Sequence, residues 1–336
     1  MTSTEKRRTE AVRMAGLLLA ALAASATVSA ATMEVRNDPT TGQYLICDRD
    51  KPVLRYNYQT VEPGEVLAKV HADNLKYARP RSDYIHPLYG LDGEELTLDW
   101  AVDHPHHRGI YWAWPEVDYQ GQRGDLHALQ RVFARPTGQC VTQDGSDHAQ
   151  ISAENLWRWE DQEPIVRELA VIRAWRSTPT GRFIDLEFQF TAIKEEVPIA
   201  RRDTSHYGGL NIRLASVKNQ EIRFHTDPPE ASPRRAWAEL SGIFSGETAT
   251  GLAVFQTPSN PEYPGEWIQY PEINWFQPTF PSAGTRYVLK PGRPLTLKFR
   301  LWIHPGKADE IQLADAWTAW VKSSESASFE TINLKK

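Results

Sequence analysis

The sequence predicts a large antiparallel β-sandwich with one helix near its C-terminal end. Short alternating runs of apolar and polar residues recur along the 336 residues. They are rich in Val, Ile, Phe, Tyr and Trp, and Gly, Pro, Asp or Asn separate them. Repeated strand–helix–strand units are absent from the pattern, which disfavours a parallel sheet flanked by helices. The predicted fold class is therefore all-β.

The predicted strands are 43–48, 52–61, 147–159, 165–175, 182–193, 210–215, 251–256 and 295–304. In the run 182–193, Ile184, Leu186 and Phe188 alternate with Asp185 and Glu187. Successive side chains of a strand point to opposite faces, so this strand has one apolar face and one wet face. Such a pattern is typical of a sandwich sheet.

One segment has the spacing of an amphipathic helix, at about 308–322. Its apolar residues Ile311, Ala314, Trp317 and Val321 fall near helical spacing. We expect this stripe to pack on the sandwich. The proline-rich segment 226–235 is interpreted as a long loop, because strands are predicted on both sides of it.

Residues 1–30 have the layout of a secretory signal peptide. A basic leader precedes an apolar run, and residues 28–30 (VSA) form a small-x-small cleavage site. The apolar run is shorter than the roughly 20 residues that a membrane span needs. We expect a periplasmic or secreted protein, with a single domain over residues 31–336 and no membrane span after cleavage.

The amino-acid composition limits the classes of binding partner. The formal net charge is −5 and no basic tract is present, which argues against nucleic acid. A small molecule or an oligosaccharide is the expected partner. The two cysteines, Cys47 and Cys140, either pair in an oxidising compartment or remain buried thiols, and the sequence leaves both alternatives open.

The stretch DHPHHRG, residues 103–109, is the centre of the predicted site. His104 precedes Pro105, which favours an extended backbone and would set His106 on the same side as His104 and His107 on the other. An H-x-H pair suits a zinc, copper or iron ion, with Asp103 as a further ligand. We expect no tightly held redox metal here, and at most a weakly bound divalent ion on His104 and His106.

Acid/base chemistry is the alternative for the same stretch. One histidine can take or give a proton at neutral pH. Asp103 would orient it, and Arg108 would bind a carboxylate or a developing negative charge. The remaining possibility is a rigid turn whose histidines bond to backbone carbonyls.

Three further stretches, residues 82–90, 203–214 and 256–270, are candidates for the same cleft, although each is also consistent with an ordinary turn. The predicted catalytic residues are Asp103, His104, His106, His107, Arg108 and His206. The predicted substrate-binding residues are His86, Tyr89, Trp112, Trp114, Tyr207, Asn260 and Trp267. Distant metal ligands would come from His86, His127, His206 or His304. Among Asp99, Glu116, Asp118 and Asp125, a pair about 5–10 Å apart could serve glycoside hydrolysis.

Five stretches also resemble a known family: YIHPLYG, DHPHHRGIYWAW, GGLNIRLA, GLAVFQTPSNPEYPGEW and LTLKFRLWIHPG, in that order. The family is labelled methane oxygenase PmoA and is also described as a domain of unknown function. The resemblance runs from about Val53 to the C-terminal helix and implies an exported bacterial protein of sugar degradation. The family's aromatic-His-Glu element is represented here by His127 alone. DTSHYGGLNIRL is more loosely similar to galactose mutarotase-like sandwiches, which place histidines and a carboxylate on a concave face.

These observations lead to one expectation and two alternatives. We expect an exported enzyme of the hydrolase, lyase or epimerase type, acting on a sugar or glycoside by histidine acid/base chemistry. The family label implies instead a metal-dependent oxidoreductase that uses the histidines. The third alternative is a non-catalytic sugar-binding module.

Overall fold

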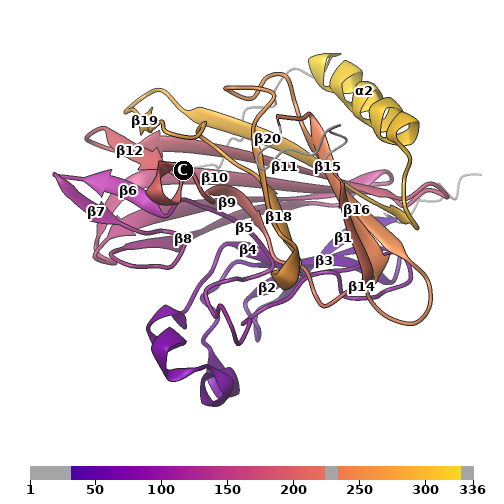
Figure 1. Ribbon diagram of the computed structural model, residues 1–336, viewed down its shortest axis with the longest axis horizontal. Helices are drawn as coiled ribbons and strands as arrows, with labels where there is room; N and C mark the ends of the chain where they lie inside the picture. The colour runs from indigo at the N-terminus through magenta and orange to yellow at the C-terminus, as the bar shows by residue number, and fades with distance from the viewer. Residues whose placement is uncertain (1–31, 224–233, 327–336) are drawn as a thin grey trace, which may run out of the picture. The chain divides into compact units, whose positions relative to one another are not determined.

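The computed structural model describes residues 32–223 and 234–326. These residues form two large sheets, one smaller sheet, a two-stranded hairpin and a C-terminal helix (Figure 1). The neighbouring strands pair antiparallel, so the predicted all-β class is confirmed. The predicted leader, residues 1–30, lies outside the described residues, as does most of the predicted loop 226–235.

The first large sheet has six strands. In spatial order they are β1 (Met33–Asp38), β2 (Gln43–Asp48), β3 (Lys51–Asn57), β4 (Tyr84–Leu88), β5 (Ile110–Ala113) and β13 (Gly209–Ile212). The register pairs Ile85 with Ile110 and Asn211 with Tyr111. Because side chains alternate, Tyr84 and Tyr111 lie on the face of this sheet opposite to Ile85 and Ile110.

The second large sheet has eight strands. In spatial order they are β14 (Lys218–Arg223), β15 (Trp237–Ile243), β16 (Thr250–Gln256), β20 (Leu295–Pro305), β11 (Arg182–Ala192), β10 (Glu163–Trp175), β9 (His148–Trp159) and β8 (Val132–Gln143). In β11, Ile184, Leu186 and Phe188 are buried while Asp185 and Glu187 are half-buried. The predicted alternation is therefore confirmed.

One apolar core joins the two sheets. Trp112 of β5 meets Phe188 of β11 with ring centroids 4.0 Å apart. Trp114 packs on Trp157 of β9 at 5.6 Å. All four side chains are buried. Burial of large aromatic side chains is a main source of sandwich stability, at about 1.5–3 kcal/mol for each fully buried residue.

Smaller elements complete the described chain. The remaining strands are β6 (Glu116–Tyr119), β7 (Gln122–Gly124), β12 (Val197–Ala200) and β19 (Tyr287–Leu289) in one sheet, and β17 (Trp267–Tyr270) with β18 (Trp275–Pro278) in a hairpin. The 3₁₀ turns are η1 (Gly64–Lys69), η2 (Ala72–Tyr77), η3 (Arg202–Thr204) and η4 (Pro271–Ile273). A bridge between Arg213 and Trp275 attaches the hairpin beside β13.

The C-terminal helix α2 (Glu310–Ser326) lies on the eight-stranded sheet (Figure 1). Its contact face is centred on Leu313 and Trp320, which pack with Phe255 and Trp302 of the sheet. The predicted stripe is wrong at Ile311, which is 73% exposed. The buried face follows Leu313 and Trp320, which are seven positions apart, and Ile311 does not lie on this face. None of the helices in the described ranges is long and apolar enough to cross a membrane.

The cysteines remain free thiols. Cys47 is buried and Cys140 is half-buried. Burial raises the pKa of the Cys140 thiol to about 11, and it also raises the pKa of Cys47. Both thiols are therefore protonated and poorly nucleophilic at neutral pH.

Candidate functional site

The DHPHHRG motif forms a tight turn. The N–H of His107 donates to the carbonyl of His104 at 2.9 Å, and the N–H of His104 donates to that of Ala101 at 3.2 Å. The His104 and His107 rings stack with centroids 4.7 Å apart, and the His106 ring meets His107 edge-on at 4.5 Å. The expectation that His107 points away from the other two is wrong, because Pro105 lies within a turn and the backbone is not extended.

A fourth histidine joins them from a distant loop. The ring of His127 lies 5.1 Å from His106 and 5.6 Å from His107. Its Nε2 lies 2.9 Å from the hydroxyl of Tyr111 in β5. Trp275 of β18 packs on His107 at 4.3 Å. His104, His106, His107 and His127 are called the histidine cluster below.

The cluster lies on the outer face of the six-stranded sheet and has a partly exposed rim. The side chains of Asp103 and His104 are 44% and 43% exposed, and His104 Nδ1 lies 2.9 Å from Asp103 Oδ2. Half-buried Tyr77 lies 5.2 Å from His106, and half-buried Tyr207 lies 4.7 Å from His127. The solvent-exposed edge of the cluster is therefore at Asp103 and His104.

Three arginines surround the cluster. Arg213 Nη2 donates to Asp103 at 3.0 Å. Arg202 pairs with Asp125. Arg81 donates to the carbonyl of His127 at 2.6 Å and lies over the Tyr111 ring. Their charges are held close to the imidazoles by the fold itself.

Burial keeps the inner histidines neutral. Burial first, and then the neighbouring His104 and Arg81, lower the pKa of His106 to about 3. The pKa values of His107 and His127 are also well below the ordinary histidine value, first because of burial and then because of the adjacent His106. Burial raises the pKa of Tyr111 well above its ordinary value, so it remains a phenol. A neutral imidazole can accept a proton or bind a metal ion.

Several buried nitrogens of the site make no hydrogen bond to the protein. They are Nδ1 of His106, His107 and His127, Nε of Arg81, and Nε and Nη1 of Arg213. In the described part of the chain, no three His, Cys, Asp or Glu side chains converge in an arrangement that could hold a metal ion.

Two predicted residues lie beside the cluster without joining it. Arg108 is fully buried and its guanidinium is bound by Asp99 and the hydroxyl of Tyr84, with Trp100 stacked 3.6 Å away. His86 bonds to Thr97 through Nδ1 at 3.0 Å. Arg108 therefore holds the turn in place, and the structure does not support its predicted role as an anion binder at the cluster.

Other predicted binding residues serve the fold. Trp112, Trp114 and Trp267 are buried, and their indole N–H groups donate to Glu168, Phe280 and Arg235 respectively. Asn260 fixes its loop to β20 through two hydrogen bonds with Lys298. The carbonyl of Tyr89 accepts from Arg182. A buried indole cannot form a stacking platform for a ligand, so the structure does not support that role for the three tryptophans.

Of the two predicted site residues in the stretch 203–214, Tyr207 reaches the cluster and His206 does not. Tyr207 contacts His127, whereas His206 is 56% exposed and bonds only locally, near Arg202 and Asp203. His304, a predicted distant metal ligand, lies on the other sheet beside Gly251 and Glu239. Of the distant histidines, the structure brings His127 alone to the cluster.

The predicted acidic residues are each bound by arginine. Asp99 pairs with Arg108 and Asp125 with Arg202, while Glu116 and Asp118 pair with Arg123 and Arg286. Burial raises the pKa of Asp125. These contacts leave no freely exposed carboxylate pair among these four.

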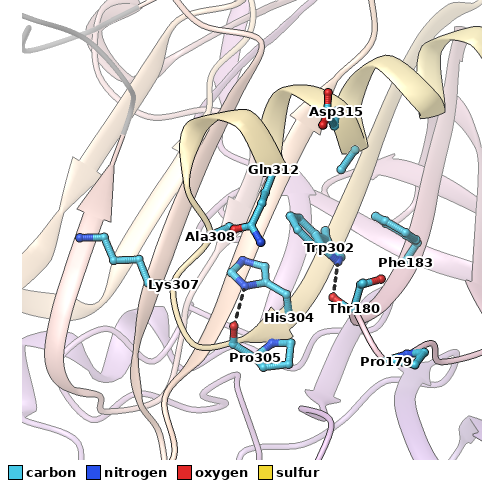
Figure 2. A pocket seen from close by; sticks show the side chains of 11 residues that line it. Pro179, Thr180, Phe183, Trp302, His304, Pro305, Lys307, Ala308, Gln312 and Asp315 are labelled. Atoms are coloured by element: carbon cyan, nitrogen blue, oxygen red, sulfur yellow. Dashed lines mark hydrogen bonds between the residues drawn. The ribbon is translucent and has the colours of Figure 1, made fainter.

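A cleft of about 560 Å³ lies between α2 and β20, away from the histidine cluster (Figure 2). Gln312 of α2 points toward Trp302 and His304 of the sheet, and Asp315 and Thr180 also line the cleft. His304 is 2% exposed, and its Nε2 lies 3.3 Å from Glu239. This cleft contains one histidine, whose ring already lies against Glu239. The histidine cluster contains four histidines, so it is the stronger candidate for proton chemistry.

Solved structures show only distant likeness. The galactose 1-epimerase of Lactobacillus acidophilus NCFM is 9% identical, with a TM-score of 0.35 over 82% of this chain and 95% of that one. A polysaccharide lyase is 12% identical, with a TM-score of 0.25 over 87% and 34%. A candidate kojibiose phosphorylase from the human microbiome is 8% identical, with a TM-score of 0.30 over 66% and 26%. The chain thus spans about a quarter of the phosphorylase and a third of the lyase. Scores this low carry no inference about activity.

No curated protein matches the sequence. The family comparison is decisive: residues 46–318 match the model of DUF6807, a family of unknown function, and the chain belongs to it. The family description names no activity, so it does not support the methane-oxygenase label of the sequence resemblance.

Proposed function

We propose that this member of DUF6807 is an exported carbohydrate-active enzyme that moves a proton on a sugar at the histidine cluster. The Asp103–His104 pair is the observation that carries the proposal. Asp103 holds His104 Nδ1 at 2.9 Å and is itself held by Arg213 at 3.0 Å. The bond at Nδ1 orients the ring and leaves Nε2 for a substrate, which is the arrangement of a general acid/base.

The rim of the cluster suits a sugar ring. Tyr77 and Tyr207 present half-buried aromatic rings beside His106 and His127. Flat aromatic faces pack on the apolar faces of sugars, while a few polar groups fix the orientation of the ligand. The partly exposed Asp103 and His104 lie at the same rim.

Proton abstraction fits the site better than glycoside hydrolysis does. Hydrolysis needs two carboxyl groups that flank the scissile bond. At the cluster, Asp103 is bound by Arg213 and Asp125 by Arg202. Neutral imidazoles beside arginines favour removal of a proton, because the positive charges stabilise the negative charge that develops. We therefore favour elimination or epimerisation as the reaction.

A divalent-metal enzyme is the second candidate. The neutral state of His106, His107 and His127 and their free Nδ1 atoms favour it. The nearby charges of Arg81 and Arg213 oppose a bound cation. A weakly bound divalent ion on His104 and His106 is therefore the second proposal for this site.

Turnover of sugars in D₂O tests the proposal. Hexoses, hexuronates and their oligosaccharides would be incubated with the full chain, and deuterium incorporation and double-bond absorbance would be followed. His104→Ala should lower the rate about 10²- to 10⁴-fold with the melting temperature unchanged. Asp103→Asn should lower kcat and change the pH profile. His148→Ala, on β9, is the control.

Two results would contradict this account. Sugar binding without turnover would identify a binding module. Activity that depends on added zinc, copper or iron, and that a chelator abolishes, would favour the metal enzyme. Export is proposed from residues 1–30, and N-terminal sequencing of periplasmic protein should begin at or near Ala31.

A further inference from the structure

The histidine cluster presents buried hydrogen-bond donors that the protein leaves unused. Arg213 donates to Asp103 through Nη2, but its Nε and Nη1 have no protein partner although the residue is 4% exposed. Arg81 is 2% exposed and its Nε is likewise free. Guanidinium nitrogens can only donate. Leaving a buried donor without an acceptor is costly, typically by about 1–3 kcal/mol.

The tautomer of His127 adds a fourth donor. Tyr111 remains a phenol, and its hydroxyl lies 2.9 Å from His127 Nε2. In the tautomer in which the hydroxyl donates to Nε2, the ring proton of His127 lies on Nδ1. This Nδ1 has no protein partner, and His127 is 1% exposed.

The charges at the cluster do not balance. Arg213 is paired with Asp103, and Arg202 is paired with Asp125. In the described ranges no carboxylate lies within ion-pair distance of Arg81, which instead bonds to backbone carbonyls and lies over the ring of Tyr111. The inner imidazoles are neutral and add no charge. The site therefore carries excess positive charge, which attracts an anion and repels a cation.

We propose that the substrate class of the histidine cluster is a sugar acid, whose carboxylate accepts from the buried donors of Arg81, Arg213 and His127. This inference rests on the proposed function and names its substrate. A carboxylate has acceptor sites for several donors at once. Asn211, opposite Tyr111 in β13, has a buried Oδ1 without a protein partner that can accept from a sugar hydroxyl.

Isothermal titration calorimetry on the full chain tests the inference. Glucuronate, galacturonate and mannuronate would each be compared with the parent neutral hexose, and acetate and zinc chloride would be titrated separately. At least one hexuronate should bind about tenfold or more tightly than its hexose, because charge-assisted hydrogen bonds are involved. The preference should weaken as salt is raised.

Variants locate the preference. Arg213→Met should remove most of the preference for the acid, and Arg213→Lys, which keeps the charge, should retain part of it. Arg300→Met, at an arginine that is also paired with an aspartate and partly buried, is the control and should retain it. The ratio of acid to neutral affinity is the readout, so a general loss of stability would not imitate the result.

Each other outcome overturns the inference. Equal binding of hexoses and hexuronates would refute the sugar acid and leave the proposed function standing. Acetate binding as tightly as the hexuronates would show that the sugar is not recognised. Zinc binding at the cluster without hexuronate binding would favour the metal site. If no sugar binds and the turnover screen is also silent, the proposed function fails as well.

Discussion

A buried pair of carboxyl groups gives the sharpest test of the electrostatics of this core. Glu168 of β10 is fully buried and accepts from the indole N–H groups of Trp112 and Trp157, both at 2.6 Å. Asp83 is 3% exposed, accepts from Tyr56 at 2.8 Å and is hydrogen-bonded to Glu168. Burial first, and then the charge of Glu168, raise the pKa of Asp83 well above its ordinary value. At neutral pH Asp83 therefore keeps its proton.

The sign and size of the effect follow from proton linkage. The folded state keeps a proton on Asp83 that the unfolded chain releases near pH 4. The free energy of unfolding that depends on this proton is fully present below that pH and is lost as the pH rises toward the raised folded pKa. The loss is about 1.4 kcal/mol per pH unit over that window. Asp83→Asn removes the titration, while its amide still donates to Glu168.

Urea unfolding of the wild type and Asp83→Asn between pH 5 and 7.5 measures this difference. The wild type should lose about 1.4 kcal/mol per pH unit relative to the variant. Asp50→Asn, at an exposed carboxylate, controls for the loss of one negative charge. A difference that stays constant with pH would show that Asp83 is ionised in the folded protein, and the argument would be refuted.

Three further predictions concern stability. The pKa values of His106, His107 and His127 are lowered in the folded protein. As the pH decreases from about 6.5, the free energy of unfolding should therefore decrease, by up to about 4 kcal/mol per pH unit for three protons. Equal stability at pH 5 and pH 7 would contradict this. Gly251→Ala places a Cβ 2.1 Å from the His304 ring and should lower the free energy of unfolding, measured by thermal unfolding, by about 1–3 kcal/mol. Gly284→Ala is the control, because its Cβ would enter open space, and it should show only the backbone strain of its positive φ. Trp112→Phe removes one hydrogen-bond donor from Glu168 and should lower the free energy of unfolding by about 1–3 kcal/mol, with hexuronate affinity unchanged. A loss of affinity without a loss of stability would show that Trp112 belongs to the binding site.

The strands were predictable because their patterns are local. In β11, Leu186 and Phe188 alternate with polar residues, and the period of two alone identifies both the strand and its buried face. The helix was predictable in position and in part of its facing, since Trp317 and Val321 of the predicted stripe pack against the cluster that contains Trp302 and Phe255. Ile311 fits the helical spacing and is nevertheless exposed.

Of the candidate site, the sequence predicted the central turn and Tyr207, which lies 4.7 Å from His127. His104, His106 and His107 were selected because they stand close together in one polar stretch. That their three rings lie together depends on a tight turn, whereas the sequence around Pro105 predicted an extended backbone. Arg81 and Trp275 reach the cluster from chain-distant segments, and no local pattern marks either of them. His127 was visible as a lone histidine, and its role appears only when the register of β5 places Tyr111 beside it.

The most direct test of the central claim is to follow the histidine side chains by nitrogen-15 NMR during titration with a hexuronate. The free protein should show His106, His107 and His127 as neutral imidazoles at pH 7, with the proton of His127 on Nδ1. Added hexuronate should shift the resonances of His104, His106 and His127 and leave His304, in the cleft under α2, unchanged. If His304 responds while the cluster does not, ligands bind under the helix and the histidine cluster is not the functional site.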